Sequence, residues 1–233
     1  RHTRYISVTG VQTCALPICR KADDLGIRNI TFKQADILRL DALGEQFDFI
    51  WSTGVLHHMQ DPVAGLRVLL KLLRPGGLFK IGLYSEPARA NVNAARAEIQ
   101  ARGLAGTAPV IRAFRQQVAA ATEDSALRPL LKFRDFYSMS ACRDLLFHVQ
   151  EHQYRLPQLA AMLAQHGLTV IGASDLMPHT LSEYRRRFPD DPAACSLQNW
   201  ERFEQQHPDT FVAMYQFWCR YDPVQAAPST APT

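Results

Sequence analysis

The chain has 233 residues, of which 47% are hydrophobic and 21% are charged, and its formal net charge is +4. This length accommodates one α/β domain with an insertion, and the apolar content is sufficient for a sizeable core. No segment has the roughly eighteen uninterrupted apolar residues of a transmembrane helix, so we expect no membrane span. Without Arg1 and Arg4 the net charge falls to +2, which is thin support for nucleic-acid binding. We interpret the one basic run, Arg185–Arg187, as a solvated helix face.

The cysteines and the first residues bear on the protein's location and origin. No two of the five cysteines form a CxxC pair, which favours free thiols in a reducing, cytoplasmic setting. Residues 1–19 look unlike the rest of the chain, and a secretory signal is a poor interpretation because Thr9, Gly10, Gln12 and Thr13 interrupt the apolar run. The segment VTGVQTCALPI instead resembles one reading frame of a common sequencing adapter. We therefore treat residues 1–19 as non-native, the alternative being a genuine irregular N-terminal arm.

The segment after residue 19 predicts alternating helices and strands. Residues 20–28 read as the end of a helix that Gly26 closes, because glycine adopts the left-handed backbone of a C-terminal cap at little cost. Ile30 and Phe32 alternate with polar residues and predict a strand that ends near Asp36. The apolar run over 47–51 predicts a second strand, buried on both faces of a sheet.

A helix and a third strand come next, at short distance. Asp61 and Pro62 are a typical helix start, with a capping side chain before a proline at the first helical position. Leucines at helical spacing continue it until the turn at 74–77, and 78–84 reads as a strand. A strand, a helix and a strand joined by short connections predict a parallel sheet with right-handed crossovers.

The second half of the chain departs from this rhythm. Residues 86–150 are helical in pattern and are interpreted as an insertion with a loop near 103–109. We then expect a helix over 156–167, a strand over 168–174, a partly helical connection over 175–210 and a last strand over 210–221. The tail, 223–233, is rich in Pro, Ala and Thr and is expected to be disordered.

The middle of the chain resembles class I, Rossmann-like methyltransferases that use S-adenosylmethionine. The residues that carry the resemblance are the pair Phe47-Asp48, the Leu56-His57-His58 loop, the pair Asp61-Pro62, the turn Leu73-Arg74-Pro75-Gly76-Gly77 and the upstream Gln34-Ala35-Asp36. The resemblance covers about residues 20–85 and 155–174. The chain also resembles a subfamily in which the domain follows tetratricopeptide repeats. The resemblance implies a three-layer α/β/α sheet, mostly parallel, and methyl transfer to an acceptor that it does not identify.

The resemblance also implies a cofactor site at the carboxyl ends of the strands, where open α/β sheets bind ligands. Asp36 and the backbone of Ile37 would hold the adenine, while Ser52, Thr53 and Gly54 would line the sulfonium and His57 would face the donor. Each could also be an ordinary turn or loop residue. The family's glycine-rich turn and the acid after its second strand have no counterpart after residue 19. We therefore expect a domain that lacks its first strands and binds S-adenosylmethionine poorly or not at all.

The insertion contains a second cluster, with His148, Glu151 and His152 at the H-x-x-E-H spacing of some zinc peptidases. On a helix these three side chains would share one face, which makes a zinc hydrolase the rival hypothesis. Glu183, Glu201 and Glu204 could each supply a third ligand, and nothing singles one out.

We prefer to interpret the insertion as a lid over the acceptor, without a metal. His148, Glu151, His152 and Tyr137 are then the catalytic candidates, with Arg134 and Asp135 nearby, because methyl transfer can require a base near neutral pH. A solvated or structural network is the plain alternative for these residues. Two other functions stay open, a non-catalytic binding module and a nucleic-acid methyltransferase.

Overall fold

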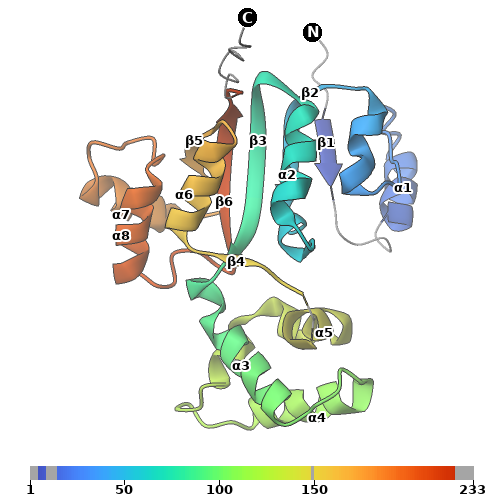
Figure 1. Ribbon diagram of the computed structural model, residues 1–233. Helices are drawn as coiled ribbons and strands as arrows, with labels where there is room; N and C mark the ends of the chain where they lie inside the picture. Colours follow the sequence, from blue (N-terminus) through green and yellow to red (C-terminus); the bar gives the residue numbers. More distant parts are fainter. Residues whose placement is uncertain (1–4, 9–14, 148–149, 224–233) are drawn as a thin grey trace, which may run out of the picture.

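The computed structural model describes residues 5–8, 15–147 and 150–223, and its centre is a six-stranded sheet (Figure 1). Five strands follow the order β1-β2-β3-β6-β5, and the short β4 pairs with the end of β3. Strands β1, β2 and β3 are parallel, whereas β6 is antiparallel to both of its neighbours, β3 and β5. The strands are β1 (Tyr5–Val8), β2 (Phe47–Thr53), β3 (Leu73–Ser85), β4 (Gln153–Tyr154), β5 (Leu168–Ala173) and β6 (Met214–Tyr221).

Eight α-helices connect or flank these strands in the described residues. The predicted helices before Gly26 and around residues 62–71 and 156–165 are confirmed, and the connection over 175–210 contains two helices. The helices are α1 (Ala15–Asp24), α2 (Pro62–Lys71), α3 (Ala90–Ala101), α4 (Ala108–Ala119), α5 (Met139–Phe147), α6 (Leu156–Gln165), α7 (Pro178–Arg187) and α8 (Leu197–Gln206). None of the described helices is long and apolar enough to cross a membrane.

Helix α2 begins as its sequence predicts. The Asp61 carboxylate accepts hydrogen bonds from the backbone N–H groups of Val63 and Ala64, at 2.9 and 3.0 Å. Pro62 takes the first helical position, where its missing N–H leaves no bond unmade. Leu66 and Leu69 are fully buried on the sheet, so the helix is anchored along one face.

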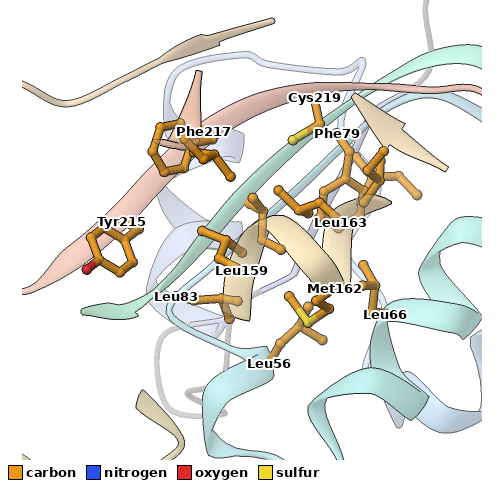
Figure 2. Close-up of a cluster of buried hydrophobic side chains, with 14 of the residues drawn as sticks. Leu56, Leu66, Phe79, Leu83, Leu159, Met162, Leu163, Tyr215, Phe217 and Cys219 are labelled. Atoms are coloured by element: carbon orange, nitrogen blue, oxygen red, sulfur yellow. The ribbon is translucent and has the colours of Figure 1, made fainter. Parts of the chain in front are cut away.

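The main core lies between one face of the sheet and helices α2, α6 and α8. Side chains of β3 and β6 alternate, and Leu83, Phe217 and Tyr215 point to this face, where α6 contributes Leu159 and Leu163 (Figure 2). Each of these five side chains is 1% exposed or less, and burial of a large apolar side chain contributes roughly 1.5–3 kcal/mol. This packing fixes the sheet on which the candidate site is built.

The opposite face of the sheet is only partly covered in the described residues. Phe49 stacks on Trp218 with ring centroids 5.3 Å apart, and the Lys80 ammonium lies 4.3 Å from the centre of the Trp51 ring. Trp51 is nevertheless 44% exposed. The fold class is Rossmann-like as predicted, but the second helical layer expected on this face is not among the described residues.

The insertion has a core of its own. Helices α3, α4 and α5 lie beyond the end of the sheet where the parallel strands terminate (Figure 1). They enclose a second cluster of buried side chains, which is separate from the core on the sheet. The cluster includes Val92, Ile99, Ile111, Phe114, Leu130 and Leu146.

One expectation for the N-terminal part is wrong, and another stays a prediction. The strand predicted to end near Asp36 is wrong, because residues 29–36 are irregular and Ile30 and Phe32 are 50% and 41% exposed. Within residues 1–19, which the sequence marks as non-native, Tyr5–Val8 nevertheless form β1 and pair with β2. Residues 29–36 pair with no described strand, and an unpaired strand is unstable. The foreign origin of residues 1–19 stays a prediction, and the disorder predicted for the tail falls on residues 224–233, outside the described ones.

Candidate functional site

The carboxyl end of β2 places a buried hydroxyl beside a sharp turn. Ser52 is 1% exposed, and its Oγ atom has no hydrogen-bond partner in the described residues. Gly54 follows with φ +75°, a backbone conformation that favours glycine, and its N–H donates to the Gly82 carbonyl at 3.3 Å. An unpaired buried polar atom in a native structure calls for a missing partner. Ser52 therefore fits a site that receives a polar ligand.

Thr53 is held in place on both sides. Its Oγ1 atom accepts a 2.7 Å hydrogen bond from the Trp51 indole N–H, and across the sheet it faces Gly82. A Cβ atom at position 82 would lie 2.5 Å from Cγ2 and 2.8 Å from Oγ1 of Thr53. The absence of a side chain at position 82 thus leaves the space that the Thr53 side chain occupies next to the turn.

We expect Gly82→Ala to destabilise the protein by about 1–3 kcal/mol, the usual cost of forcing an extra group into a packed space. Urea unfolding measures this. The matched variant is Gly82→Ala with Thr53→Ala, which removes the two closest atoms and should recover part of the loss. No recovery in the double variant would contradict the assigned contact.

Asp36 and Ile37 lie at the start of a 3-10 helix and not at the end of the strand that the sequence predicts. Asp36 is exposed at the start of a 3-10 helix, η2 (Ile37–Leu43), and its carboxylate accepts a 3.0 Å hydrogen bond from the Leu38 N–H. Ile37 is half-buried against the main core. The carboxylate therefore serves as a helix cap, and no described strand ends at Asp36.

The histidine loop after β2 forms a second 3-10 helix, η3 (Leu56–His58), and buries His57 completely. The His57 ring stacks on Tyr84 with centroids 3.7 Å apart, and the Arg89 guanidinium carbon lies 3.9 Å from the centre of the Tyr84 ring. Tyr84 is thus sandwiched between an imidazole and a cation. Burial raises the pKa of the Tyr84 phenol above its usual value, which Arg89 partly opposes.

Glu151 fastens the end of the insertion to this stack. Its carboxylate accepts two hydrogen bonds from Arg89, at 2.6 and 2.9 Å, and one from Arg96, at 2.7 Å. The side chains of Glu151 and Arg89 are 3% and 1% exposed, so this is a buried ion pair. Gln153 adds a hydrogen bond to the same carboxylate at 2.9 Å. Both oxygens of Glu151 are therefore engaged, and its role is to hold Arg89.

The predicted single helical face for the H-x-x-E-H residues is wrong. Helix α5 ends at Phe147, and Glu151 and His152 lie beyond it in irregular chain, because the carboxylate turns inward to the two arginines. His148 lies outside the described residues. The described residues contain no group of three or more His, Cys, Asp or Glu side chains that could hold a metal ion.

The other two catalytic candidates lie in different surroundings. The backbone N–H of His152 donates to the His57 backbone carbonyl at 2.8 Å. The ring atom Nε2 of His152 is buried without a hydrogen-bond partner among the described residues. Tyr137 is 59% exposed, and its hydroxyl donates to the Leu131 carbonyl inside the insertion. The structure thus joins His152 to the histidine loop and leaves Tyr137 with the insertion.

The sequence gives little sign of a buried carboxyl beside the end of β3. Glu204 is 7% exposed, and its carboxylate accepts hydrogen bonds from the Tyr215 hydroxyl at 2.8 Å and from the Ser85 hydroxyl at 3.4 Å. Burial raises the pKa of Glu204 above its usual value. Only its place on the buried face of α8, beside Trp200 and Phe203, could have indicated that it lies inside.

The raised pKa of Glu204 predicts a pH-dependent stability. A carboxyl whose pKa is raised by folding stabilises the protein fully below its unfolded pKa and loses that contribution as the pH rises through its folded pKa. We therefore expect wild type to gain stability relative to Glu204→Gln as the pH is lowered from about 7 to about 5. Urea unfolding of both proteins measures the difference, and a gap that does not change with pH would contradict it.

The comparisons with known proteins fit this arrangement. Residues 2–81 match a family model described as a methyltransferase domain, and they contain β1, β2, the histidine loop, α2 and most of β3. This first third of the chain is therefore similar to a methyltransferase domain. A protein from Synechococcus is 30% identical over 75% of this chain and 43% of its own length. A 27-O-demethylrifamycin SV methyltransferase from Amycolatopsis mediterranei is 30% identical over 42% of this chain and 39% of its own length.

The fold is shared with a solved structure. A structure described as PKMT2 from Rickettsia typhi in complex with AdoHcy aligns with 97% of this chain and 45% of that chain, at a TM-score of 0.63 and 17% identity. The chain thus spans less than half the length of these relatives. The identity is low, so the likeness concerns the fold, and it confirms the Rossmann-like class that the sequence predicts.

Proposed function

We propose that the domain transfers a methyl group from S-adenosylmethionine to an acceptor, at the carboxyl end of β2. The observation that carries the proposal is the buried, unpartnered Ser52 hydroxyl beside the Gly54 turn, within a segment that matches the methyltransferase family. When bound, S-adenosylmethionine would supply an electrophilic methyl group on its sulfonium. The protein's part is to bind and orient the donor and the acceptor.

The residues proposed to hold the donor are those at the end of β2. Ser52 offers a hydroxyl, and Gly54 keeps the chain free of a side chain where the ligand approaches. His57 follows this turn in the chain and stacks on Tyr84, so we assign it a supporting role in the loop. Asp36 and the Ile37 backbone stay proposed as adenine contacts. For Asp36, this requires its carboxylate to keep an oxygen available beside the Leu38 N–H.

We propose His152 as the residue that accepts a proton from the acceptor. It is tied to the histidine loop through its backbone N–H, and its Nε2 atom is buried without a partner in the described residues. A neutral imidazole can accept a proton near neutral pH, which methyl transfer to a hydroxyl or amine requires. Glu151 is proposed as a positioning residue, because its two arginine partners leave it no free oxygen.

The weak binding expected for this chain is also part of the proposal. We propose that residues 1–19 are foreign, and that they do not supply the glycine-rich turn that holds the amino-acid end of the donor. The first test therefore uses a form in which the natural sequence replaces residues 1–19. In that form, calorimetry measures the affinity for S-adenosylhomocysteine.

We expect Ser52→Ala to weaken this affinity by about fivefold, since a typical hydrogen bond contributes about 1 kcal/mol. Ser182→Ala is the matched control, because its exposed hydroxyl bonds only to the Pro178 carbonyl at the start of α7. This control should leave the affinity unchanged. Equal affinities of wild type and Ser52→Ala would contradict the proposed site at the end of β2.

A further inference from the structure

The insertion contains a hollow that the proposed methyl transfer does not use. It measures about 330 Å³ and lies between α4 and the segment 128–137. Helix α4 contributes Arg112, Arg115 and Gln116, and the facing segment contributes Leu131, Phe136 and Tyr137. Every one of these residues belongs to the insertion, so the hollow is built independently of the sheet. Its volume is in the range of small-molecule sites.

The charges in the hollow are of one sign. Arg112 and Arg115 are one helical turn apart on α4, and no described carboxylate forms an ion pair with either. Arg115 donates instead to the Tyr137 carbonyl at 2.8 Å and contacts the Met139 sulfur at 3.6 Å. Like charges one turn apart on a helix repel each other. An anion between them would remove this repulsion.

The walls add an apolar, aromatic component. The Arg115 guanidinium lies 5.7 Å from the centre of the Phe136 ring, and Tyr137 is 59% exposed although its hydroxyl is bonded to the Leu131 carbonyl. The Tyr137 hydroxyl is thus already bonded within the insertion, and its ring is the part left to contact a ligand. A planar guanidinium binds a carboxylate through two parallel hydrogen bonds, and a flat apolar body can pack on an aromatic ring.

We propose that this hollow binds a carboxylate carried on a flat apolar body, such as an aromatic acid. The two arginines would hold the carboxylate, and Tyr137 and Leu131 would contact the body. The assignment also gives Tyr137 a role in binding within the insertion, in place of the catalytic role predicted from the sequence. It does not depend on S-adenosylmethionine, so it can fail or succeed separately from the proposed function.

The test is ¹⁹F NMR of 4-fluorobenzoate titrated with the complete chain. We expect saturable binding that Arg112→Gln weakens by about tenfold, the loss typical of one hydrogen bond to a charged group. Arg115→Gln should have a similar effect. If Arg115→Gln fails to fold, Arg112→Gln still tests the site, because Arg112 is exposed and its replacement should not affect folding. Arg134→Gln is the matched control, because it removes the same charge from the facing segment without lining the hollow.

Two further probes separate the parts of the proposal. 4-Fluorobenzamide has the same shape without the charge, and inorganic phosphate has charge without the apolar body. We expect neither to displace 4-fluorobenzoate at equal concentration. Equal binding of the amide would overturn the role of the arginines, and displacement by phosphate would overturn the role of the aromatic wall. No binding of 4-fluorobenzoate, or equal weakening by Arg134→Gln, would overturn the site.

Discussion

Replacing Glu151 with alanine is expected to lower the free energy of unfolding by about 3–5 kcal/mol, the cost of removing one partner from a buried ion pair. The carboxylate accepts hydrogen bonds from both Arg89 and Arg96, and Arg89 is 1% exposed. Without Glu151, a buried guanidinium keeps its charge and loses its partner. Urea unfolding followed by circular dichroism measures the change.

The control is a second glutamate–arginine pair in the insertion. Glu98 bonds to Arg102 at 2.9 Å on the outside of α3, where the two side chains are 35% and 44% exposed. An exposed pair contributes about 0–1 kcal/mol, so Glu98→Ala should have a small effect. If Glu151→Ala lost no more stability than Glu98→Ala, then Glu151 would not hold the insertion to the histidine loop.

Replacing Trp200 with alanine is expected to cost about 3–5 kcal/mol, as is typical for a buried aromatic residue. Trp200 is fully buried on α8, and it stacks on Tyr184 of α7 with centroids 3.9 Å apart. Its indole N–H donates to the Ala194 carbonyl at 2.9 Å, so the variant also leaves a buried carbonyl unpaired. Thermal and urea unfolding would both report the loss.

The matched control for Trp200 is Phe32, an aromatic residue outside the core. Phe32 is 41% exposed in the irregular segment that follows α1. A surface substitution of this kind usually changes the stability by about 0.5 kcal/mol or less. A loss for Phe32→Ala as large as that for Trp200→Ala would mean that residues 29–36 are packed in solution, as a strand in this segment would require.

The parts of the fold that can be predicted from sequence are those with local signals. The Asp61-Pro62 start of α2, the glycines at 26 and 167 and the apolar strand at 47–51 each express a preference of the residues themselves. The helical character of the insertion is also predictable, because its three helices carry apolar residues at helical spacing. In these segments tertiary packing agrees with local preference.

The segments where the prediction is wrong depend on distant partners. Ile30 and Phe32 alternate as a strand should, but a strand needs a neighbour, and residues 29–36 pair with no strand in the described part of the chain. The spacing of His148, Glu151 and His152 suggests one helical face, but two arginines from the other side of the insertion draw Glu151 out of the helix. Neither the missing neighbour nor the arginine contacts can be read from the local sequence.

The candidate site is predictable in outline and differs in its assignments. The histidine loop directly follows the end of β2, and the Ser52 hydroxyl there is buried without a partner in the described residues. That these residues bind a ligand stays a prediction. Sequence reasoning missed Arg89 and Tyr84, although they hold His57, because residues so far apart in sequence carry no shared motif. The one local sign for Arg89 is its place three residues before Val92, in register with the buried face of α3.

The measurement closest to the central claim is calorimetric binding of S-adenosylhomocysteine to two forms of the protein. One is the chain of 233 residues, and the other has the natural sequence in place of residues 1–19. We predict that the second form binds the ligand and that the first binds at least about tenfold more weakly, because we propose that residues 1–19 do not supply the contacts to the amino-acid end of the ligand. Failure of both forms to bind would contradict the proposed methyl-donor site, and equal binding by both would contradict the foreign origin assigned to residues 1–19.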